Sequence, residues 1–454
     1  MKIVIAGGGK VGFTLAENLA SDNHDIYLID TNETVLKKAD DMLDVMCIRG
    51  NGGSVETLKS AGVDTADVVI AVTDRDELNM LCCLMAKKLG AKYTVARIRD
   101  PEYSGEASRI KHDLDIDMVI NPENTTAMRI SRLIRFPQAI DIDVFYRGQI
   151  ELVGFKVEES DLIAGLSIAE AQKRLGDLPV LFCAIEHNGV TSIPNGSSVI
   201  ETGDKAYVIG EIVNVNDFFR NIGRIEHRSR SVIITGGGRV GLYLAQTLSR
   251  IGMNIKIIES NYARCARLCE MLPKALIVNG DGTDQELLAS ENLDKAGVFV
   301  SLTGHDEDNL VMALYAKSAG VPKVIAKITR QNYYGLVNGL NVDSVVNPKM
   351  ITAYSILRKI RSMHNTQGGH MESLFQIANG SAEAIEFAVH SDAKHLGIPL
   401  RELKIKKGVL VSVIVRRGKF IIPKGGDHIE DGDDIIIVTT GSVPILDVND
   451  MYED

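Results

Sequence analysis

The chain has 454 residues, 45% of them hydrophobic and 24% charged, and its formal net charge is −10. This length allows two to four domains with well-buried cores, and the apolar content excludes a disordered chain. An acidic chain lacks the basic face that neutralises phosphates, so neither nucleic acid nor an anionic lipid surface is expected as a direct partner. No apolar run reaches 18 residues and the first predicted strand begins at the N-terminus, so we expect no transmembrane helix and no signal peptide.

The six cysteines contain no C-x-x-C pair. Cys265 and Cys269 lie one helical turn apart, but no second pair or histidine cluster completes a metal site. We therefore expect no metal and predict buried thiols in a reducing cytoplasm. The six are Cys47, Cys82, Cys83, Cys183, Cys265 and Cys269.

The first thirty residues contain the pattern of a dinucleotide-binding unit. A short apolar run at 3–6 predicts a buried parallel strand, and the loop 7–12 that follows it fits G-x-G-x-x-G. Apolar residues at helical spacing predict a helix over 13–19, and the run 26–29 predicts a second strand that ends in Asp30. Strand, glycines, helix, strand and acidic residue in this order are far more specific than a lone glycine pattern.

Each part of this unit has a chemical role. Gly7 permits the tight turn, Gly9 lets backbone amides approach a pyrophosphate, and Gly12 lets the helix pack close to the strand. The helix N-terminus offers unpaired N–H groups and a partial positive charge to phosphates. Asp30, 18 residues after Gly12, stands where a carboxylate accepts hydrogen bonds from a ribose. We predict nucleotide binding here; the alternative is a structural glycine turn without a ligand.

The same unit recurs in the second half of the chain. A second glycine loop, 236–241, follows an apolar run, and the next predicted strand ends in Glu259. The second loop lies 229 positions after loop 7–12, and Glu259 lies 229 positions after Asp30. A fixed offset indicates a duplication.

Between Asp30 and residue 120, predicted helices and strands alternate. Helices are expected over 33–42, 54–61, 77–89 and 103–111, and strands over 44–48, 67–72, 93–97 and 118–120. This alternation predicts a parallel, doubly wound sheet whose ligands lie beyond the carboxyl ends of the strands. The residues at such ends, which we expect to form one site, are Asp30, Asn51, Thr73, Asp74 and Arg97. In the helix over 77–89, the apolar face is expected to consist of Leu78, Leu81, Leu84 and Met85.

Asn121 and Pro122 interrupt the alternation, and Pro122 suits the start of a helix. The helix over 123–136 is expected to leave the sheet and cross to a partner. From residue 141, short alternating strands and turn residues predict a separate α+β lobe of roughly 85 residues. Strands are expected over 151–157, 180–186 and 206–210 and a helix over 168–175. Arginines at 220, 224, 228 and 230 are expected to belong to a solvated linker.

The second half repeats this order, with Asn347 and Pro348 in place of Asn121 and Pro122. We therefore predict an α/β protein with two tandem Rossmann-like, doubly wound parallel-sheet domains, each followed by a small α+β lobe. The expected boundaries are 1–137 and 231–362 for the nucleotide-binding domains, 138–224 and 372–454 for the small lobes, and 225–230 and 363–371 for linkers.

The pattern predicts a nucleotide that is bound without being consumed. Neither small lobe carries a His–Asp, Ser–His or Cys–His constellation, and Lys10 and Arg239 lack the G-K-[ST] context of a phosphoryl-transfer loop. Such a nucleotide is an effector, which shifts a conformational equilibrium by its differential affinity for two states. We therefore expect a protein that is not an enzyme.

Tandem glycine-loop domains, the Asn-Pro helices and the paired Pro-x-Gly and Glu-x-Gly-Asp motifs at 194–204 and 423–433 resemble the RCK (KTN) regulators of potassium transport over nearly the whole chain. The resemblance implies a cytosolic homo-oligomeric ring, expected to be a tetramer. It also implies peripheral attachment to the inner face of the cell membrane through a membrane-embedded potassium channel or transporter subunit. The effector would be NAD or NADH, with ATP or ADP as the alternative.

The resemblance also implies the cofactor-binding residues. In the first copy these are Gly7, Gly8, Gly9, Lys10, Val11 and Gly12 at the diphosphate, Asp30 at the adenosine ribose, and Asn51, Thr73, Asp74 and Arg97 around the pocket. In the second copy they are Gly236, Gly237, Gly238, Arg239, Val240, Gly241, Glu259, Asp281 and Thr303. Gly304 replaces Asp74 and Lys327 replaces Arg97, so the second site is expected to bind more weakly or to prefer another nucleotide. The acids Asp30 and Glu259 should repel a 2′-phosphate and favour NAD(H) over NADP(H).

Two other functions remain open from the sequence. One is an NAD-dependent oxidoreductase with an unrecognised active site, which NADH turnover would reveal. The other is a nucleotide sensor whose partner is not a channel, which copurification with a multi-span membrane protein would exclude.

Overall fold

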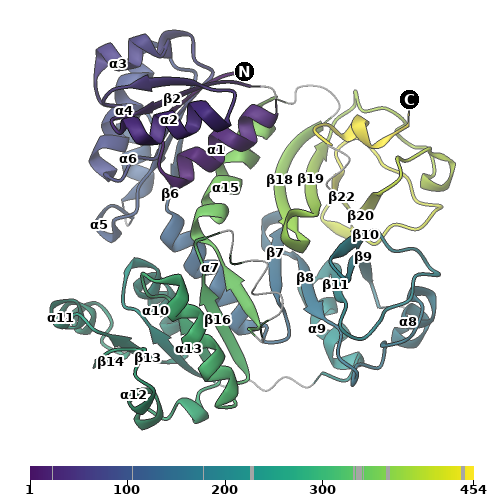
Figure 1. Ribbon diagram of the computed structural model, residues 1–454. Coiled ribbons are helices and arrows are strands. Elements are labelled where there is room, and N and C mark those ends of the chain that lie inside the picture. The colour runs from purple at the N-terminus through teal and green to yellow at the C-terminus, as the bar shows by residue number, and fades with distance from the viewer. Residues whose placement is uncertain are drawn as a thin grey trace. The chain divides into compact units, whose positions relative to one another are not determined.

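The computed structural model describes residues 1–454 except 23, 105, 177, 225–229, 331–332, 334–339, 341, 365–368, 441–444 and 454. The chain, coloured along its length in Figure 1, divides into two compact units. One contains Met1–Ser131 and Ser229–Ile360, and the other contains Arg132–Arg228 and Arg361–Asp454. Each unit therefore takes one segment from each half of the duplicated chain, so the halves are interleaved.

The first unit begins with a six-stranded parallel sheet in the order β3-β2-β1-β4-β5-β6. Its strands are β1 (Lys2–Ala6), β2 (Asp25–Asp30), β3 (Met46–Arg49), β4 (Val68–Ala71), β5 (Tyr93–Arg97) and β6 (Met118–Ile120). Its helices are α1 (Lys10–Ser21), α2 (Glu33–Met42), α3 (Val55–Ser60), α4 (Asp76–Leu89), α5 (Pro101–Ser104) and α6 (Ala107–Asp113), with a 3₁₀ turn η1 (Val63–Thr65). Strand order reverses between β1 and β4, as the doubly wound prediction requires.

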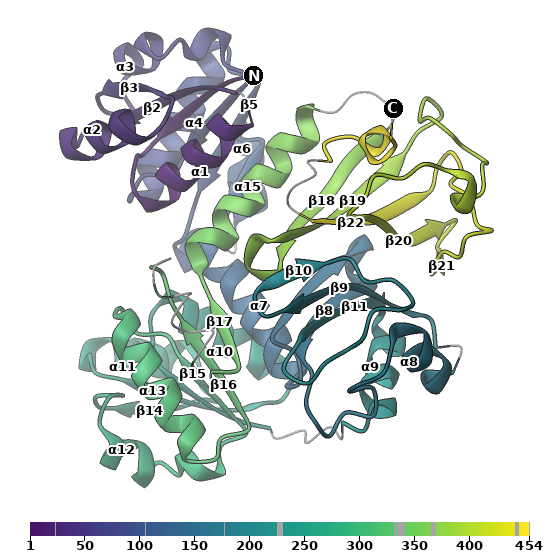
Figure 2. The same cartoon turned by 45° about the vertical axis from the view of Figure 1, so that its right-hand side comes forward.

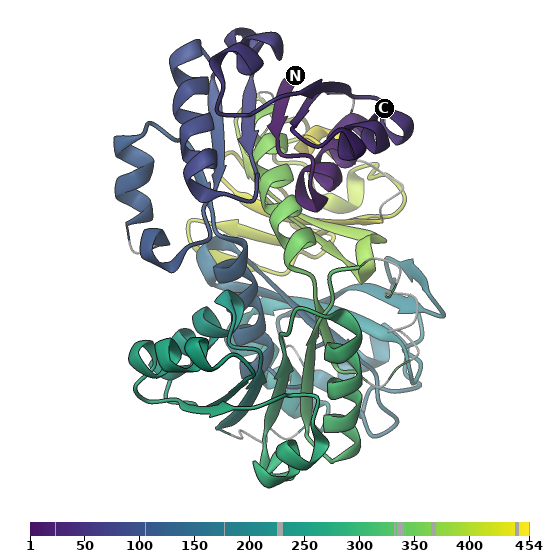
Figure 3. The same cartoon turned by 60° about the vertical axis from the view of Figure 1, so that its left-hand side comes forward.

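The centre of this sheet is built from the apolar run that opens the sequence. Residues Ile3, Val4, Ile5 and Ala6 have no exposed surface, and β1 pairs in parallel with both β2 and β4. Helices on both faces of the sheet (Figure 3) explain why β1 is apolar throughout instead of alternating. Burying each such Val or Ile contributes about 1.5–3 kcal/mol.

The second sheet of this unit repeats the first, in the order β14-β13-β12-β15-β16-β17. Its strands are β12 (Ser231–Thr235), β13 (Asn254–Glu259), β14 (Leu276–Asn279), β15 (Val298–Ser301), β16 (Lys323–Lys327) and β17 (Ser344–Val346). Its helices are α10 (Arg239–Arg250), α11 (Tyr262–Met271), α12 (Gln285–Ser290) and α13 (Asp306–Ser318), with η3 (Leu293–Lys295). The predicted fold class, two Rossmann-like parallel-sheet domains, is confirmed.

The helices α7 (Pro122–Arg135) and α15 (Pro348–His364) cross from one domain of this unit to the other. The Asn121 amide, just before α7, donates to the Tyr243 hydroxyl of α10 at 2.9 Å. In the reverse direction, α15 lies beside α1 (Figures 1 and 2), and its Lys359 ammonium lies 5.7 Å from the Tyr93 ring centroid. The partner to which α7 crosses in this unit is thus the other half of the same chain.

Two local predictions in the first domain are wrong. Leu81 of α4 is 41% exposed, and the buried face of this helix is instead made by Asp76, Asn79, Cys82, Cys83 and Ala86. Small and thiol side chains let α4 pack close to the sheet. Side-chain size, more than hydrophobicity, therefore determines which face of α4 is buried. The expected single helix over 103–111 is two short helices, α5 and α6.

The second unit contains two five-stranded antiparallel sheets (Figure 2), in the orders β10-β9-β11-β8-β7 and β18-β19-β22-β20-β21. The first lobe has β7 (Asp141–Phe145), β8 (Ile150–Lys156), β9 (Val180–His187), β10 (Val190–Ser192), β11 (Lys205–Glu211), α8 (Ile168–Leu175), α9 (Ile212–Asn221) and η2 (Tyr146–Gly148). The second has β18 (Gly369–Ile377), β19 (Ala382–Val389), β20 (Val409–Arg416), β21 (Lys419–Ile421), β22 (Asp434–Thr440), η5 (Ala378–Gly380), η6 (Leu400–Glu402) and η7 (Val448–Met451).

The two lobes share one hydrophobic core. The rings of Phe145 and Phe375 meet edge to face with centroids 4.8 Å apart. The Tyr146 amide of the first lobe donates to a carboxylate oxygen of Glu386 in the second at 3.0 Å. The lobes therefore form one folded body within this unit.

Two predictions about the linker segments are wrong. Arg224 belongs to the packed first lobe, where its side chain is 10% exposed and pairs with Asp161 at 2.6 Å, so its solvated role is wrong. Arg228 lies outside the described residues. Residues 363–364 and 369–371 of the predicted linker 363–371 belong instead to α15, which runs to His364, and to β18, which begins at Gly369.

All six cysteines are free, but they are not all buried as predicted. Burial raises the pKa of the Cys82 and Cys183 thiols to about 12. Cys83 and Cys265 are also buried, whereas Cys47 is half-buried and Cys269 is exposed on α11. The prediction of a buried thiol is therefore wrong for Cys269.

Candidate nucleotide-binding site

The glycine loop of the first domain joins β1 to α1 in a turn that larger residues would block. Gly7 has φ +107°, in the left-handed region that favours glycine. A Cβ on Gly12 would lie 1.8 Å from the Gly7 carbonyl oxygen, and a Cβ on Gly9 would meet nothing within 4 Å. Gly9 precedes α1 without a side-chain cap, so the first amides of this helix are free to bind an anion.

Asp30 ends β2 with its carboxylate fixed by two backbone amides. Its Oδ2 accepts from the Gly8 N–H at 2.7 Å, and its Oδ1 accepts from the Asn32 N–H at 2.8 Å. Each carboxylate oxygen keeps acceptor capacity after these bonds. Asp30 can therefore accept hydrogen bonds from a ribose without moving.

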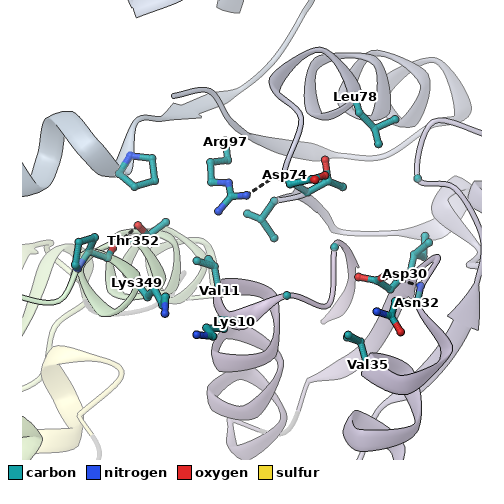
Figure 4. A pocket seen from close by; sticks show the side chains of 18 of the residues that line it. Lys10, Val11, Asp30, Asn32, Val35, Asp74, Leu78, Arg97, Lys349 and Thr352 are labelled. Carbon is teal, nitrogen blue, oxygen red and sulfur yellow. Dashed lines mark hydrogen bonds between the residues drawn. The ribbon is translucent and has the colours of Figure 1, made fainter. Parts of the chain in front are cut away.

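A cavity of about 600 Å³ opens at these residues (Figure 4). Among its lining residues are nine of the predicted ones: Gly7, Gly9, Lys10, Val11, Asp30, Asn51, Thr73, Asp74 and Arg97. Gly8 and Gly12 do not line it: the Gly8 amide is bonded to Asp30, and Gly12 packs against the Gly7 carbonyl. The structure thus brings the predicted residues of the first copy to one place.

The second domain completes this cavity, which sequence reasoning missed. The contributed residues are Val240, Lys327, Thr329, Pro348, Lys349 and Thr352. Val240, predicted as part of the second site, therefore lies on the first cavity. Figure 4 shows Lys349 and Thr352 on α15, across from Lys10 and Val11 on α1. Arg97 and Lys327 lie 230 positions apart, which identifies them as equivalent residues of the two copies but does not show that they lie near each other.

Four cationic side chains line the cavity: Lys10, Arg97, Lys327 and Lys349. Burial lowers the pKa of Arg97 to about 10, and burial together with the neighbouring Lys10 lowers the pKa of Lys349 to about 8. Burial also lowers the pKa of Lys327, whose ammonium donates to the Leu302 carbonyl at 3.0 Å. Depressed pKa values of neighbouring cations indicate a place where an anion would be stabilised.

Two buried polar residues of α4 hold the strand ends around the cavity, and the sequence analysis did not identify them. Asn79, with no exposed surface, accepts from the Thr73 amide at 2.8 Å and donates to the Arg97 carbonyl at 2.8 Å. Asp76 accepts from the amides of Arg99 and Asp100, each at 2.8 Å. The available signal was their repetition at Asn309 and Asp306, where the same bonding recurs.

The second glycine loop has the same geometry as the first. Gly236 has φ +98°, and a Cβ on Gly241 would lie 2.4 Å from the Gly236 carbonyl oxygen. A Cβ on Gly238 would meet nothing within 4 Å. The side chain of Arg239 points to the first domain, with its Nη2 3.6 Å from an Asp100 oxygen.

The acid of the second copy is more enclosed than Asp30. Glu259 is 5% exposed, accepts from the Gly237 amide at 2.9 Å and pairs with Arg264 at 3.2 Å. Asp281 accepts from the Thr283 amide at 2.9 Å, and the Thr303 hydroxyl lies 2.8 Å from the Asn309 oxygen. The Arg264 pair occupies an oxygen that a ribose would need.

The described part of the chain offers neither a metal site nor a membrane-spanning helix. Within it, no group of three or more His, Cys, Asp or Glu side chains could hold a metal ion. No helix there combines the length and the apolar content needed to cross a bilayer.

Tandem Rossmann-like domains with glycine loops, crossover helices and paired small lobes define the chain as a duplicated RCK-type protein. The TrkA-N domain model matches residues 3–122 and 232–348, and the TrkA-C domain model matches 384–443. The Trk system potassium uptake protein TrkA of Vibrio alginolyticus is 32% identical, with 100% of this chain and 99% of the relative covered. A TrkA homolog of Archaeoglobus fulgidus is 34% identical, with 96% and 97% covered. The chain belongs to the TrkA family.

Solved structures show the same fold. The GsuK channel bound to NAD has a TM-score of 0.63 and 17% identity, covering 97% of this chain and 77% of that one. The GsuK RCK domain has the same TM-score and identity, with 97% and 92% covered. At this identity the likeness concerns the fold alone.

Proposed function

We propose that this chain is the regulatory subunit of a potassium uptake system, in which a nucleotide bound in the first cavity gates ion flux allosterically. The relatives that match over their full length are named as Trk system potassium uptake proteins. The observation that carries the nucleotide part is the cavity itself, where a glycine loop, an uncapped helix N-terminus and a fixed Asp30 carboxylate meet. These groups match the diphosphate and ribose of an adenine nucleotide.

We infer the effector, the location and the assembly of this chain from its family. The effector is NAD or NADH, with ATP or ADP as the alternative, since all share the adenosine and the diphosphate. The protein acts in the cytoplasm, as a ring of identical chains, expected to be four, docked on a membrane-embedded potassium channel or transporter subunit. The formal net charge of −10 supports neither nucleic acid nor direct lipid binding. The second glycine-loop site binds a nucleotide more weakly, because Arg264 pairs with Glu259 and Gly304 replaces Asp74.

The deciding experiment is a titration of NAD, NADH, ADP and ATP against the purified chain, combined with ion flux in liposomes that contain the candidate channel subunit. The proposal expects saturable binding and a nucleotide-dependent change in potassium flux. Consumption of NADH with small acids, alcohols or quinones would instead establish an oxidoreductase. Nucleotide binding that leaves potassium flux unchanged would indicate a nucleotide sensor whose partner is not a channel.

Asp30→Ala should weaken NAD(H) binding by roughly tenfold or more, because charge-assisted hydrogen bonds to a ribose are worth about 1.5–3 kcal/mol. Isothermal titration calorimetry measures the change. Asp41→Ala is the matched control, since it removes one exposed carboxylate from α2 away from the cavity lining. Equal affinity in wild type and Asp30→Ala would remove Asp30 from the site.

Lys349 should take up a proton when a nucleotide binds at about pH 8.5. Its pKa is lowered to about 8, so the amine is largely neutral in the free protein at that pH, and an anionic diphosphate near Lys10 would raise this pKa again. Because protons are taken up, affinity should fall as pH rises above 8. Calorimetry in two buffers of different ionisation enthalpy reports the uptake, which Lys349→Met should remove. The same uptake in that variant would contradict the assignment.

A further inference from the structure

Two polar atoms in the first cavity are buried and have no hydrogen-bond partner. They are Nε of Arg97, at the end of β5, and Oε2 of Glu123, in the first turn of α7. Both residues line the cavity. A buried donor or acceptor without a partner costs about 1–3 kcal/mol, so this pair marks a place where a ligand group can be accommodated favourably.

The protein holds the Arg97 side chain in place. The Arg97 guanidinium donates through Nη2 to the Thr73 carbonyl, so its position at the strand end is fixed. Burial raises the pKa of Glu123, while the charges of Arg99, Arg239 and Arg97 oppose that rise. The two side chains thus offer one donor and one acceptor to the cavity.

The subsite lies away from the adenosine end. Figure 4 shows Arg97 and Asp30 on different sides of the start of α1, where phosphates are expected to bind. A ligand with its adenosine ribose at Asp30 and its diphosphate at α1 would extend beyond the diphosphate toward Arg97. The same cavity is also lined by Pro122, Val240 and Pro348, which provide apolar surface for a ring.

The chemistry of the pair discriminates between the two candidate nucleotides. A terminal phosphate of ATP accepts from Arg97 but has nothing to donate to Glu123, and its negative charge repels that carboxylate. A carboxamide has both a carbonyl acceptor and an NH₂ donor, and it carries no charge. A carboxamide on a second nucleoside can bond to both Nε of Arg97 and Oε2 of Glu123, whereas a phosphate can bond only to Nε of Arg97.

We propose that Arg97 and Glu123 form a subsite for the carboxamide of a nicotinamide dinucleotide, so that the first cavity selects NAD(H) over ATP. This proposal rests on the proposed nucleotide-binding function and adds the ligand class. Arg97 donates to the amide oxygen and Glu123 accepts from the amide nitrogen. Lys10 and Lys349 remain available for the diphosphate.

The test compares NAD, deamido-NAD, ADP and ATP on the full chain by calorimetry, with and without Mg²⁺. Deamido-NAD replaces the carboxamide by a carboxylate, so it should bind wild type at least tenfold more weakly than NAD. ATP should also bind more weakly than NAD. This comparison of ligands requires no variant to fold.

Glu123→Gln keeps an acceptor but removes the charge, so deamido-NAD and ATP should each gain about fivefold or more while NAD changes by less than about threefold. Glu123→Ala should weaken NAD about tenfold and leave ADP unchanged. Glu56→Gln, an exposed position on α3, is the control and should change none of the four affinities.

The outcomes separate the two proposals. If ADP and NAD both fail to bind, nucleotide binding itself is wrong. If ADP and NAD bind but deamido-NAD binds as tightly as NAD, or ATP binds more tightly than NAD, the carboxamide subsite is wrong while the nucleotide site stands. Glu123 variants that leave every affinity unchanged would also overturn the subsite.

Discussion

Gly12→Ala should unfold the first nucleotide-binding domain more easily and abolish its ligand binding. A Cβ at this position would lie 1.8 Å from the Gly7 carbonyl oxygen, so α1 must move away from β1. Overpacking of this kind costs about 2–3 kcal/mol, roughly 10 °C in the unfolding midpoint of a domain of this size. Displacing the start of α1 would also lose two or more charge-assisted hydrogen bonds to a diphosphate, about a hundredfold in affinity.

Differential scanning calorimetry and nucleotide titration measure the two effects. Gly9→Ala is the matched control for stability, because a Cβ there meets nothing within 4 Å. Its unfolding midpoint should remain that of wild type. A Gly12→Ala protein as stable as Gly9→Ala would show that α1 does not pack on the loop as the structure has it.

Asp161→Ala should strongly destabilise the unit that contains the small lobes. The Asp161 side chain is 1% exposed and pairs with Arg224 at 2.6 Å, and the Arg224 guanidinium lies 5.2 Å from the Phe155 ring centroid. Removing the carboxylate leaves a buried guanidinium without its partner, which costs about 3–5 kcal/mol. Chemical denaturation followed by circular dichroism measures the loss.

Asp217→Ala is the matched control, because its ion pair with Arg220 at 2.8 Å is exposed and is worth at most about 1 kcal/mol. Combining Asp161→Leu with Arg224→Met should restore much of the stability, since an apolar pair of similar volume avoids an unpaired charge. An Asp161→Ala protein no less stable than Asp217→Ala would show that the buried pair contributes little.

The parallel sheets could be predicted because their determinants are local. The run 3–6 is apolar throughout, and the loop 7–12 allows one sharp turn. Because the glycine loop recurs 229 positions later, the same reasoning predicts the second sheet. The small lobes were also predictable in outline, since turn residues separate their strands. The two lobes differ in detail, because the segment equivalent to α8 forms only the 3₁₀ turn η6.

What the sequence could not show depends on contacts between distant segments. Lys349 and Val240 line the first cavity only because α15 and α10 pack on the first domain. Arg224 lies in a polar stretch, and nothing local distinguishes a solvated arginine from one that pairs with Asp161, 63 positions away. Asn79 occupies a position in α4 where hydrophobic spacing predicts no polar anchor.

The crossing of α7 and α15 has an evolutionary consequence. If the two copies were separate identical chains, each substitution would alter both nucleotide-binding domains of the pair at once. Joining the two copies in one polypeptide removes that restriction, and Glu123 and Lys349, which hold equivalent places after Asn-Pro, now carry opposite charge. A single gene can therefore evolve two different nucleotide-binding domains from one ancestral domain.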